Sequence, residues 1–191
     1  MKKIILYAFT ATILLLSNFP IFAAPHTISI GIPQQNTFTE KNEDGSKIEA
    51  DELSGYFLGI KFPVGFGLGI DSYKTKFIGG TSKIETFMYN IFYQFPIPVI
   101  DIIIGLGSGK TKLACSACAE DYTDPESDKK TGYKAGEASQ WFTSFGIQLT
   151  QLIDIHMSYR SVTSNKIEQV YSGTKVNYNG TVRGIGLAFN F

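Results

Sequence analysis

The 191-residue chain is poor in the residues from which most catalytic and metal sites are built, with two histidines, two cysteines and one tryptophan. Its 17 basic and 17 acidic residues balance, so no basic surface for nucleic acid is indicated. No apolar run reaches the roughly 20 residues that a helix needs to cross a bilayer. These shortages argue against a nucleic-acid-binding domain and against a helical membrane protein.

The N-terminus has the layout of a secretory signal peptide. Lys2 and Lys3 provide the positive charge, and residues 4–16 form an apolar stretch of 13. We expect cleavage after Ala23, because cutting one residue later would leave proline at the first mature position. No cysteine follows the apolar stretch, so a lipid anchor is not expected. Residues 1–23 are thus predicted to be a signal peptide, and 24–191 a single domain with a net charge of about −2, from 15 basic and 17 acidic residues.

The two cysteines are close together, in the sequence Cys115-Ser116-Ala117-Cys118. Behind a signal peptide, such a pair suits an oxidising compartment and a local disulfide, with free thiols as the alternative. A redox pair would be expected beside a βαβ pattern, and a zinc site would need a nearby histidine. Neither is found, so we predict no metal and no cofactor.

Strand periodicity runs through the whole mature domain, with one apolar face and one polar or glycine-rich face. In residues 100–107, for example, one face of the strand is apolar, and Asp101 lies on the opposite face. The apolar face contains Ile100, Ile102, Ile104 and Leu106. A proline, Pro33, interrupts the first strand and predicts a bulge or a lost hydrogen bond there. Eight strands are expected, near 27–38, 50–61, 64–71, 83–95, 100–107, 138–149, 153–160 and 184–191.

The connections between these strands alternate between short and long. Short links are expected near 62–63, 96–98 and 150–151, and long polar links near 39–49, 75–82, 112–137 and 164–175. This asymmetry is typical of outer-membrane barrels, which have short periplasmic turns and longer extracellular loops. It places both termini in the periplasm and the four long loops outside.

Three features favour a membrane barrel over a water-soluble one. The strands are expected to have about 9–11 residues, the length of a tilted transmembrane strand. The face opposite the apolar one is rich in glycine, which makes room inside a narrow barrel: Gly55, Gly59, Gly65, Gly67, Gly69, Gly105, Gly107, Gly109, Gly146 and Gly186. Aromatic residues near the strand ends suit the girdles at the membrane interfaces: Phe62, Phe66, Tyr93, Phe95, Trp141, Phe189 and Phe191.

The C-terminal residues carry a family resemblance. Gly186, Phe189 and Phe191 resemble the terminal signal that the outer-membrane assembly machinery reads, and the chain is similar to the small eight-stranded outer-membrane proteins, including opacity-type proteins and OmpA-like transmembrane domains. The resemblance implies an all-β fold, a closed up-and-down antiparallel transmembrane β-barrel of about eight strands in the bacterial outer membrane. Outer-membrane lipid, lipopolysaccharide and the assembly machinery are its implied partners.

The inward face of the strands contains six ionisable residues, which we expect to form a salt-bridge network that plugs the lumen, because buried charges need partners. The alternative is that they line a narrow pore. Those near the periplasmic end are Lys61, Asp101, Asp154 and His156, while Asp71 and Arg160 lie higher.

The sequence contains one pattern that suggests catalysis. His156-Met157-Ser158 resembles the His-x-Ser of outer-membrane lipid A deacylases, in which His acts as base for Ser. The family's following Asn is Tyr159 here, the motif lies beside a short turn, and its parity points inward. We therefore predict no catalytic residue and a non-enzymatic structural or adhesin-like role, in which the loops contact host or environmental ligands. A narrow channel for small or hydrophobic solutes is the alternative, and lipid A modification is the least favoured.

Overall fold

The computed structural model describes residues 26–41, 47–77, 83–97, 100–115, 118, 122–126, 129–130, 132–164, 167–170, 175–176 and 178–191. The expected signal peptide, 1–23, lies outside them. Eight long strands contain most of the described chain: β1 (Thr27–Lys41), β2 (Lys47–Lys61), β3 (Phe66–Phe77), β4 (Lys83–Phe95), β5 (Ile100–Ala114), β9 (Gly136–Gln148), β10 (Ile153–Ser164) and β13 (Gly180–Asn190).

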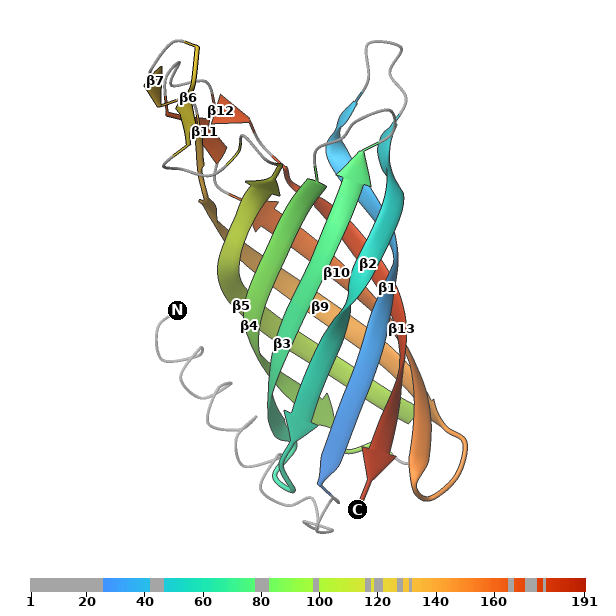
Figure 1. The fold of residues 1–191 in the computed structure, drawn as a ribbon. Helices are drawn as coiled ribbons and strands as arrows, with labels where there is room; N and C mark the ends of the chain where they lie inside the picture. The colour runs from blue at the N-terminus through green and yellow to red at the C-terminus, as the bar shows by residue number, and fades with distance from the viewer. Residues whose placement is uncertain are drawn as a thin grey trace, which may run out of the picture.

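These strands form one closed antiparallel barrel in the order β1-β13-β10-β9-β5-β4-β3-β2 (Figure 1). Each strand pairs with its neighbour along the chain, and the last pairs with the first from Thr27↔Asn190 to Phe38↔Gly180. Closure satisfies the backbone groups that a sheet edge would leave unpaired, which is a requirement in lipid. The predicted fold class, an all-β up-and-down barrel of about eight strands, is confirmed.

The first strand contains the irregularity that its proline predicts. The β1–β13 register shifts between Pro33 and Gln35. Pairing of β1 with β2 stops after Gly31 and resumes at Thr37. Proline has no N–H to donate to a ladder, so the bulge lies where a ladder bond is missing.

One rim of the barrel carries both ends of the domain and the short turns (Figure 1). The turn between β2 and β3 is closed by hydrogen bonds from the Phe62 amide to the Phe66 carbonyl and from the Gly65 amide to the Phe62 carbonyl. Gly65 has a φ of +86°, a conformation that favours glycine. The Phe191 amide donates to the His26 carbonyl across 2.9 Å, which joins the two ends.

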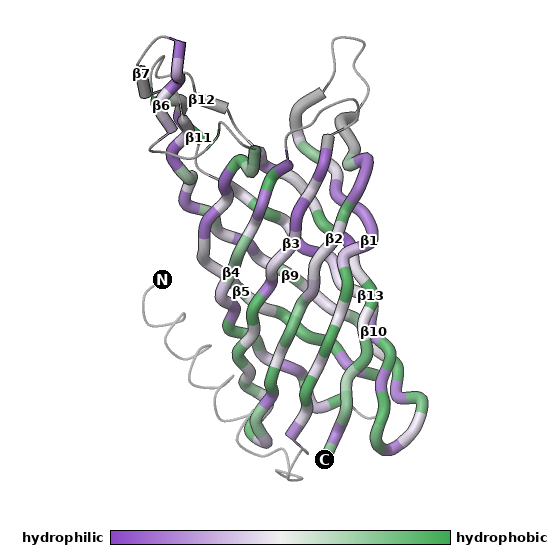
Figure 2. The backbone as a smooth tube through the Cα atoms, viewed as in Figure 1, coloured by the Kyte–Doolittle hydropathy of each residue, from purple (hydrophilic) through white to green (hydrophobic). Residues whose placement is uncertain are grey.

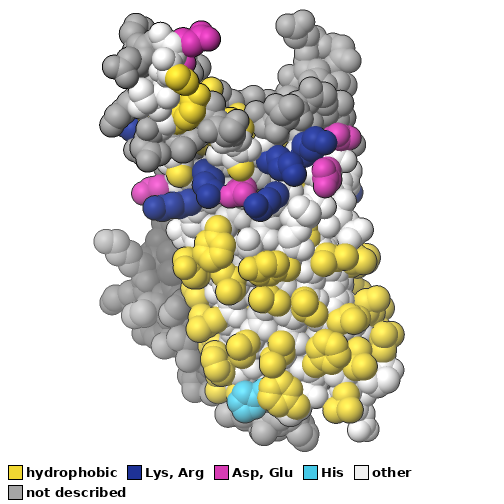
Figure 3. Space-filling view, viewed as in Figure 1, with side chains coloured by type: hydrophobic (Ala, Val, Ile, Leu, Met, Phe, Trp, Pro, Cys, Tyr) yellow, Lys and Arg dark blue, Asp and Glu magenta, His cyan; other side chains and the backbone are white. Residues whose placement is uncertain are grey.

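Large hydrophobic side chains cover the outside of the barrel instead of its interior. Tyr89 is 67% exposed and Leu106 is 60% exposed. Water-soluble monomers rarely expose a continuous apolar surface of this extent. On the face drawn in Figure 3, hydrophobic side chains form a broad belt over the half of the barrel that carries the short turns, with a row of charged side chains above it. The belt includes Ile28, Ile30, Ile60, Leu68, Ile91, Ile104, Trp141, Phe145, Ile155, Met157, Ile185, Leu187 and Phe189.

The strands have 11 to 15 residues, so the expected 9–11 is too short. Above the belt the outward residues become charged, as in Lys74, Glu85, Lys110 and Lys112, and Figure 2 shows the change to polar residues along the strands. The inward residues stay buried there, as Thr111 does. Strands that rise above the lipid lose their apolar outward face, and with it the pattern that predicts them.

The segments expected as long loops therefore contain further strand. β1 continues to Lys41, β2 begins at Lys47 and β3 continues to Phe77. Beyond the barrel rim, β6 (Thr123–Asp124) pairs with β7 (Lys129–Lys130). A second small sheet combines β8 (Tyr133–Lys134), β11 (Ile167–Gln169) and β12 (Lys175–Val176). Among the described residues, no helix has the length and hydropathy to cross a membrane.

Candidate functional site

The lumen contains the buried polar and charged side chains of the strands, and its side chains form three groups. An apolar cluster occupies the half nearer the long loops, formed by Tyr73, Met88, Ala138, Val162 and Val182 with Phe57 beneath. A mid-lumen cluster contains Asp71, Asn90, Gln140 and Arg160. A turn-end cluster contains Lys61, Asp101, Asp154, His156 and Asn190.

The mid-lumen cluster is built on an ion pair that spans the barrel. Arg160 Nε donates to Asp71 Oδ2 across 2.8 Å, and Nη2 lies 3.4 Å from Oδ1. Asp71 is on β3 and Arg160 on β10, which are four strands apart in the eight-strand order and so face each other. Both are at least 95% buried. The pair ties opposite walls together.

The Gln140 amide adds a further hydrogen bond to this ion pair and links it to Asn90. Gln140 Nε2 donates to Asp71 Oδ2 and to Asn90 Oδ1, both across 2.6 Å. Gln140 is on β9 and Asn90 on β4, so the cluster joins four strands. Buried charges are tolerated when their remaining hydrogen-bonding positions are satisfied.

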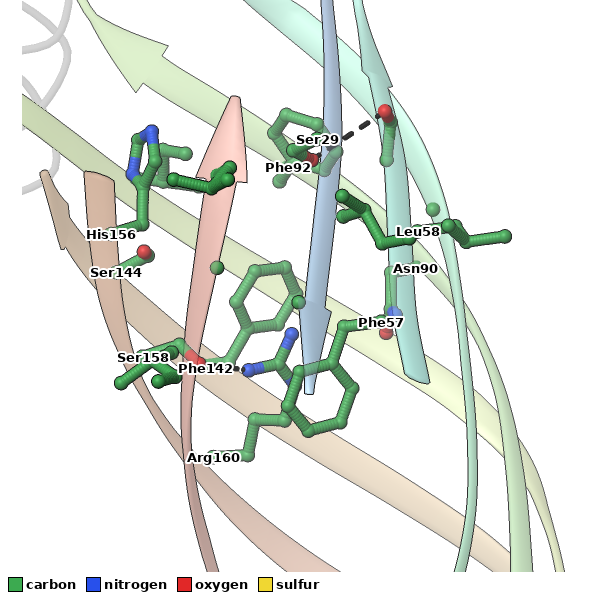
Figure 4. A pocket seen from close by; sticks show the side chains of 18 residues that line it. Ser29, Phe57, Leu58, Asn90, Phe92, Phe142, Ser144, His156, Ser158 and Arg160 are labelled. Carbon is green, nitrogen blue, oxygen red and sulfur yellow. Dashed lines mark hydrogen bonds between the residues drawn. The ribbon is translucent and has the colours of Figure 1, made fainter. Parts of the chain in front are cut away.

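Aromatic rings close the space around the guanidinium (Figure 4). The Arg160 Cζ lies 3.5 Å from the Phe57 ring centroid and 5.1 Å from that of Phe142, within the range of cation–π attraction. Arg160 Nη1 also donates to Ser158 Oγ across 2.6 Å. Phe142 pairs in register with Gly105, and its ring occupies the space that a side chain at position 105 would fill.

The turn-end cluster surrounds two carboxylates. Asp154 Oδ2 accepts a 2.7 Å bond from Asn190 Nδ2, and Asn190 Oδ1 accepts from Thr27. Asp101 accepts from Gln94 and lies 3.8 Å from His156 Nε2. Between this cluster and the mid-lumen cluster is a cavity of about 70 Å³, bordered by Ser144, His156 and Arg160, among others (Figure 4). Space of that size holds only a few water molecules.

The His-x-Ser pattern does not form a nucleophile–base pair here. His156 and Ser158 are both on the lumen face of β10, and neither ring nitrogen of His156 has a hydrogen-bond partner. Ser158 Oγ instead accepts from Arg160 and lies 3.4 Å from the Gly184 carbonyl. A serine that is held by a guanidinium and has no base beside it is not activated.

The six ionisable residues expected in the lumen separate into two groups. The structure brings Asp71 to Arg160, and it brings Asp101, Asp154 and His156 together with Lys61, which interacts electrostatically with both carboxylates. The sequence interpretation did not single out Gln140, Asn90 or Asn190, although their parity points inward. Nor did it single out Phe57 and Phe142, whose parity also points inward but whose contact with Arg160 has no signal in the sequence.

The remaining predicted site residues lie at opposite ends of the barrel. Cys115 and Cys118 form a disulfide just beyond β5, with Cα atoms 5.0 Å apart. Gly186 and Phe189 are on β13, and Phe191 follows it at the short-turn rim. Phe189 and Phe191 point outward and are exposed, and Gly186 faces the lumen opposite Gly31.

A filled polar lumen inside an apolar belt defines a transmembrane β-barrel of the small eight-stranded outer-membrane type. Solved structures with this fold include Neisserial surface protein A, with a TM-score of 0.58, 12% identity and coverage of 87% of this chain and 96% of that one. The attachment invasion locus protein Ail of Yersinia pestis has a TM-score of 0.54 and 14% identity, with coverage of 89% and 100%.

The N-terminal barrel domain of Pseudomonas aeruginosa OprF is a further structure with this fold, with a TM-score of 0.51, 12% identity and coverage of 88% of this chain and 99% of that one. In sequence the chain is more isolated, since no family model and no curated protein matches it. The similarity is therefore one of fold, and it confirms the resemblance to small eight-stranded outer-membrane barrels.

Proposed function

We propose that this chain is an integral protein of a bacterial outer membrane that acts without catalysis, through the surface formed by its outer loops. The observation that carries the proposal is the filled lumen. The apolar cluster and the Arg160–Asp71 pair occupy it at successive heights, and the cavity below them measures only about 70 Å³. Because side chains occupy the lumen, the interaction surfaces proposed for this barrel are those at its rims.

The proposal orients the barrel with both termini and the short turns in the periplasm. The long connections then lie outside, on a rigid scaffold of the kind that commonly presents binding loops. The largest excursion begins after β5, carries the disulfide and includes β6, β7 and β8. The disulfide restrains the four residues at the start of this segment, which lowers the entropy that ordering them on binding would cost.

Attachment to a host or environmental surface is the interaction we propose for these loops. Two barrels with this fold have names that fit such a role, one as a surface protein and one as an attachment and invasion protein whose structure contains a heparin analogue. Outer-membrane lipid, including lipopolysaccharide, is the proposed partner of the belt and of the charged row above it. The assembly machinery is the proposed reader of Gly186, Phe189 and Phe191.

The experiment compares the adhesion of bacteria that express the intact chain with that of two loop variants. In the first variant, residues 115–131 are replaced by a Gly/Ser segment, which removes both cysteines. In the control, residues 78–82 are replaced in the same way. We expect adhesion to epithelial monolayers and to matrix-coated surfaces to fall to the empty-vector level only in the first variant.

Folding is checked by the shift in gel migration between unboiled and boiled samples, which must be the same for all three proteins. Adhesion of the intact chain at the vector level on every surface would overturn the proposal. So would unchanged adhesion after replacement of all four outer connections.

A further inference from the structure

Three potential metal ligands meet at the short-turn end of the lumen. Asp101 comes from β5, and Asp154 and His156 come from β10. One ligand atom from each lies within 4.8 Å of the others, and His156 Nε2 is 3.8 Å from Asp101 Oδ2. Two carboxylates and an imidazole are a ligand set that divalent transition metals bind.

The strand register explains why these side chains converge. Asp101 pairs with Gly146, and Gly146 pairs with His156, so the three residues form one row across β5, β9 and β10. A Cβ at position 146 would lie 2.4 Å from His156 Nδ1, so only glycine leaves room for the ring to lie over β9 toward Asp101. Asp154 is two residues before His156 and therefore shares its face of β10.

Three buried polar atoms at the site lack hydrogen-bond partners. His156 is 8% exposed, and both of its ring nitrogens are buried without a hydrogen bond. Asp154 is 3% exposed, and its Oδ1 is also unpartnered. Buried polar groups normally have partners, so these atoms indicate a group that binds between them.

The other oxygens of the carboxylates are held by neighbouring amides. Asn190 donates to Asp154 Oδ2, and Gln94 donates to Asp101 Oδ1. Each amide fixes the orientation of its carboxylate while one oxygen stays available. Such supporting hydrogen bonds around ligand side chains are a usual part of protein metal sites.

One charge opposes a cation at this place. Lys61 is 6% exposed and interacts electrostatically with Asp101, Asp154 and His156. With a neutral imidazole, the two carboxylates and the ammonium leave a net charge of −1, so a cation is still attracted. Lys61 is therefore expected to lower the affinity of the site for a cation without abolishing binding. Removing its charge should raise that affinity, which provides a second test.

We propose that Asp101, Asp154 and His156 bind a divalent transition-metal ion, with Zn²⁺ as the best match. One imidazole and two carboxylates supply three protein ligands, and water fills the fourth position. Zn²⁺ lies about 2.0–2.2 Å from such ligands, so the three side chains draw closer together on binding. The bound ion ties β5 to β10 across β9 and fastens the periplasmic end of the barrel.

The experiment uses the full mature barrel, folded in detergent micelles and stripped of metal with chelator. Isothermal titration with ZnCl₂ should give one saturable site, and a Co²⁺ titration should give the visible absorption of a low-coordinate site. His156→Gln should weaken binding by more than the 10–100-fold that is typical when only a supporting residue of a metal site is changed. Lys61→Gln should tighten binding, because it removes a like charge.

His26→Gln is the matched control, since the chain's other histidine is exposed at the same rim, where it stacks on Phe191. Its binding should equal that of the intact chain. Gel migration of unboiled samples checks folding, and Asp101→Asn replaces His156→Gln if the latter does not fold. No saturable site in the intact barrel, or equal affinity in His156→Gln or in Asp101→Asn, would overturn the proposal. So would a loss of affinity in His26→Gln.

Discussion

At the scale of single residues, Arg160 is a charged side chain that is buried in the lumen and needs a counter-charge. Its guanidinium is buried at mid-height, lies 3.5 Å from the Phe57 ring centroid, and has Asp71 as its ion-pair partner. Asp71 also accepts a hydrogen bond from Gln140. A charge in such a place is stable only while its partner remains, so the two residues act as a unit.

Asp71→Asn is therefore predicted to destabilise the folded barrel by about 3–5 kcal/mol, because it leaves the arginine buried without a counter-charge. Chemical unfolding in lipid vesicles measures the effect, with the fluorescence of Trp141, the one tryptophan, as the probe. Glu137→Gln, on the exposed outer face, is the control and should cost little. Equal costs for the two variants would show that the ion pair does not stabilise the barrel.

At the scale of the strand, β5 shows how one element meets three environments. Its outward residues are apolar from Ile100 to Leu106, then polar at Ser108, then basic at Lys110 and Lys112. Its inward residues include Asp101, Gly105 and Thr111. The outward residues of β5 therefore change in polarity where the strand leaves the lipid, and its inward residues are those that fit the lumen.

Ile104→Lys is predicted to destabilise the barrel by about 2–4 kcal/mol, since it puts a charge at the centre of the apolar belt. Ser108→Lys, four residues along the same face, should cost about 0–1 kcal/mol because it lies at the edge of the belt. Reversible unfolding in lipid vesicles compares the two. If both cost the same, the belt does not face lipid at the height assigned to it.

At the scale of the whole molecule, the barrel is a closed wall around an interior occupied by side chains, with a cavity of about 70 Å³ between the two polar clusters. The first and last strands pair from Thr27↔Asn190 to Phe38↔Gly180 with one bulge, so the sheet closes on itself and neither terminal strand is left as a free edge. The apolar cluster and the Arg160–Asp71 pair fill the lumen at successive heights. The walls are therefore linked through the interior as well as around the circumference.

The filled lumen predicts that the intact barrel gives no steady conductance in planar bilayers. Joint replacement of Asp71 and Arg160 by alanine removes the link between opposite walls and should produce openings that the intact chain lacks. Boiled protein in the same detergent is the control. A reproducible open state in the intact chain would favour the channel alternative over a surface role.

The sequence by itself determined the strands, their faces and the closed membrane barrel. Alternation is a local property, so Ile100 to Leu106 reveal their outward face without reference to any other strand. The strand ends above the lipid were underestimated, because Lys74 and Lys110 carry no apolar signal. The inward aromatics Phe57 and Phe142 were not singled out, because alternation gives the face of a residue and does not say what an apolar ring on the inward face will contact.

Only the tertiary structure decided which lumenal groups meet. Asp71 and Arg160 are 89 residues apart, and Gln140 and Asp71 are 69 apart. Nothing in either segment specifies the other, because their contact depends on how many strands close the barrel and on the register between them. The row from Asp101 through Gly146 to His156 arises in the same way. Strand parity predicts that Asp101 and His156 point inward, but only the closure of the barrel and its register determine which side chains they meet.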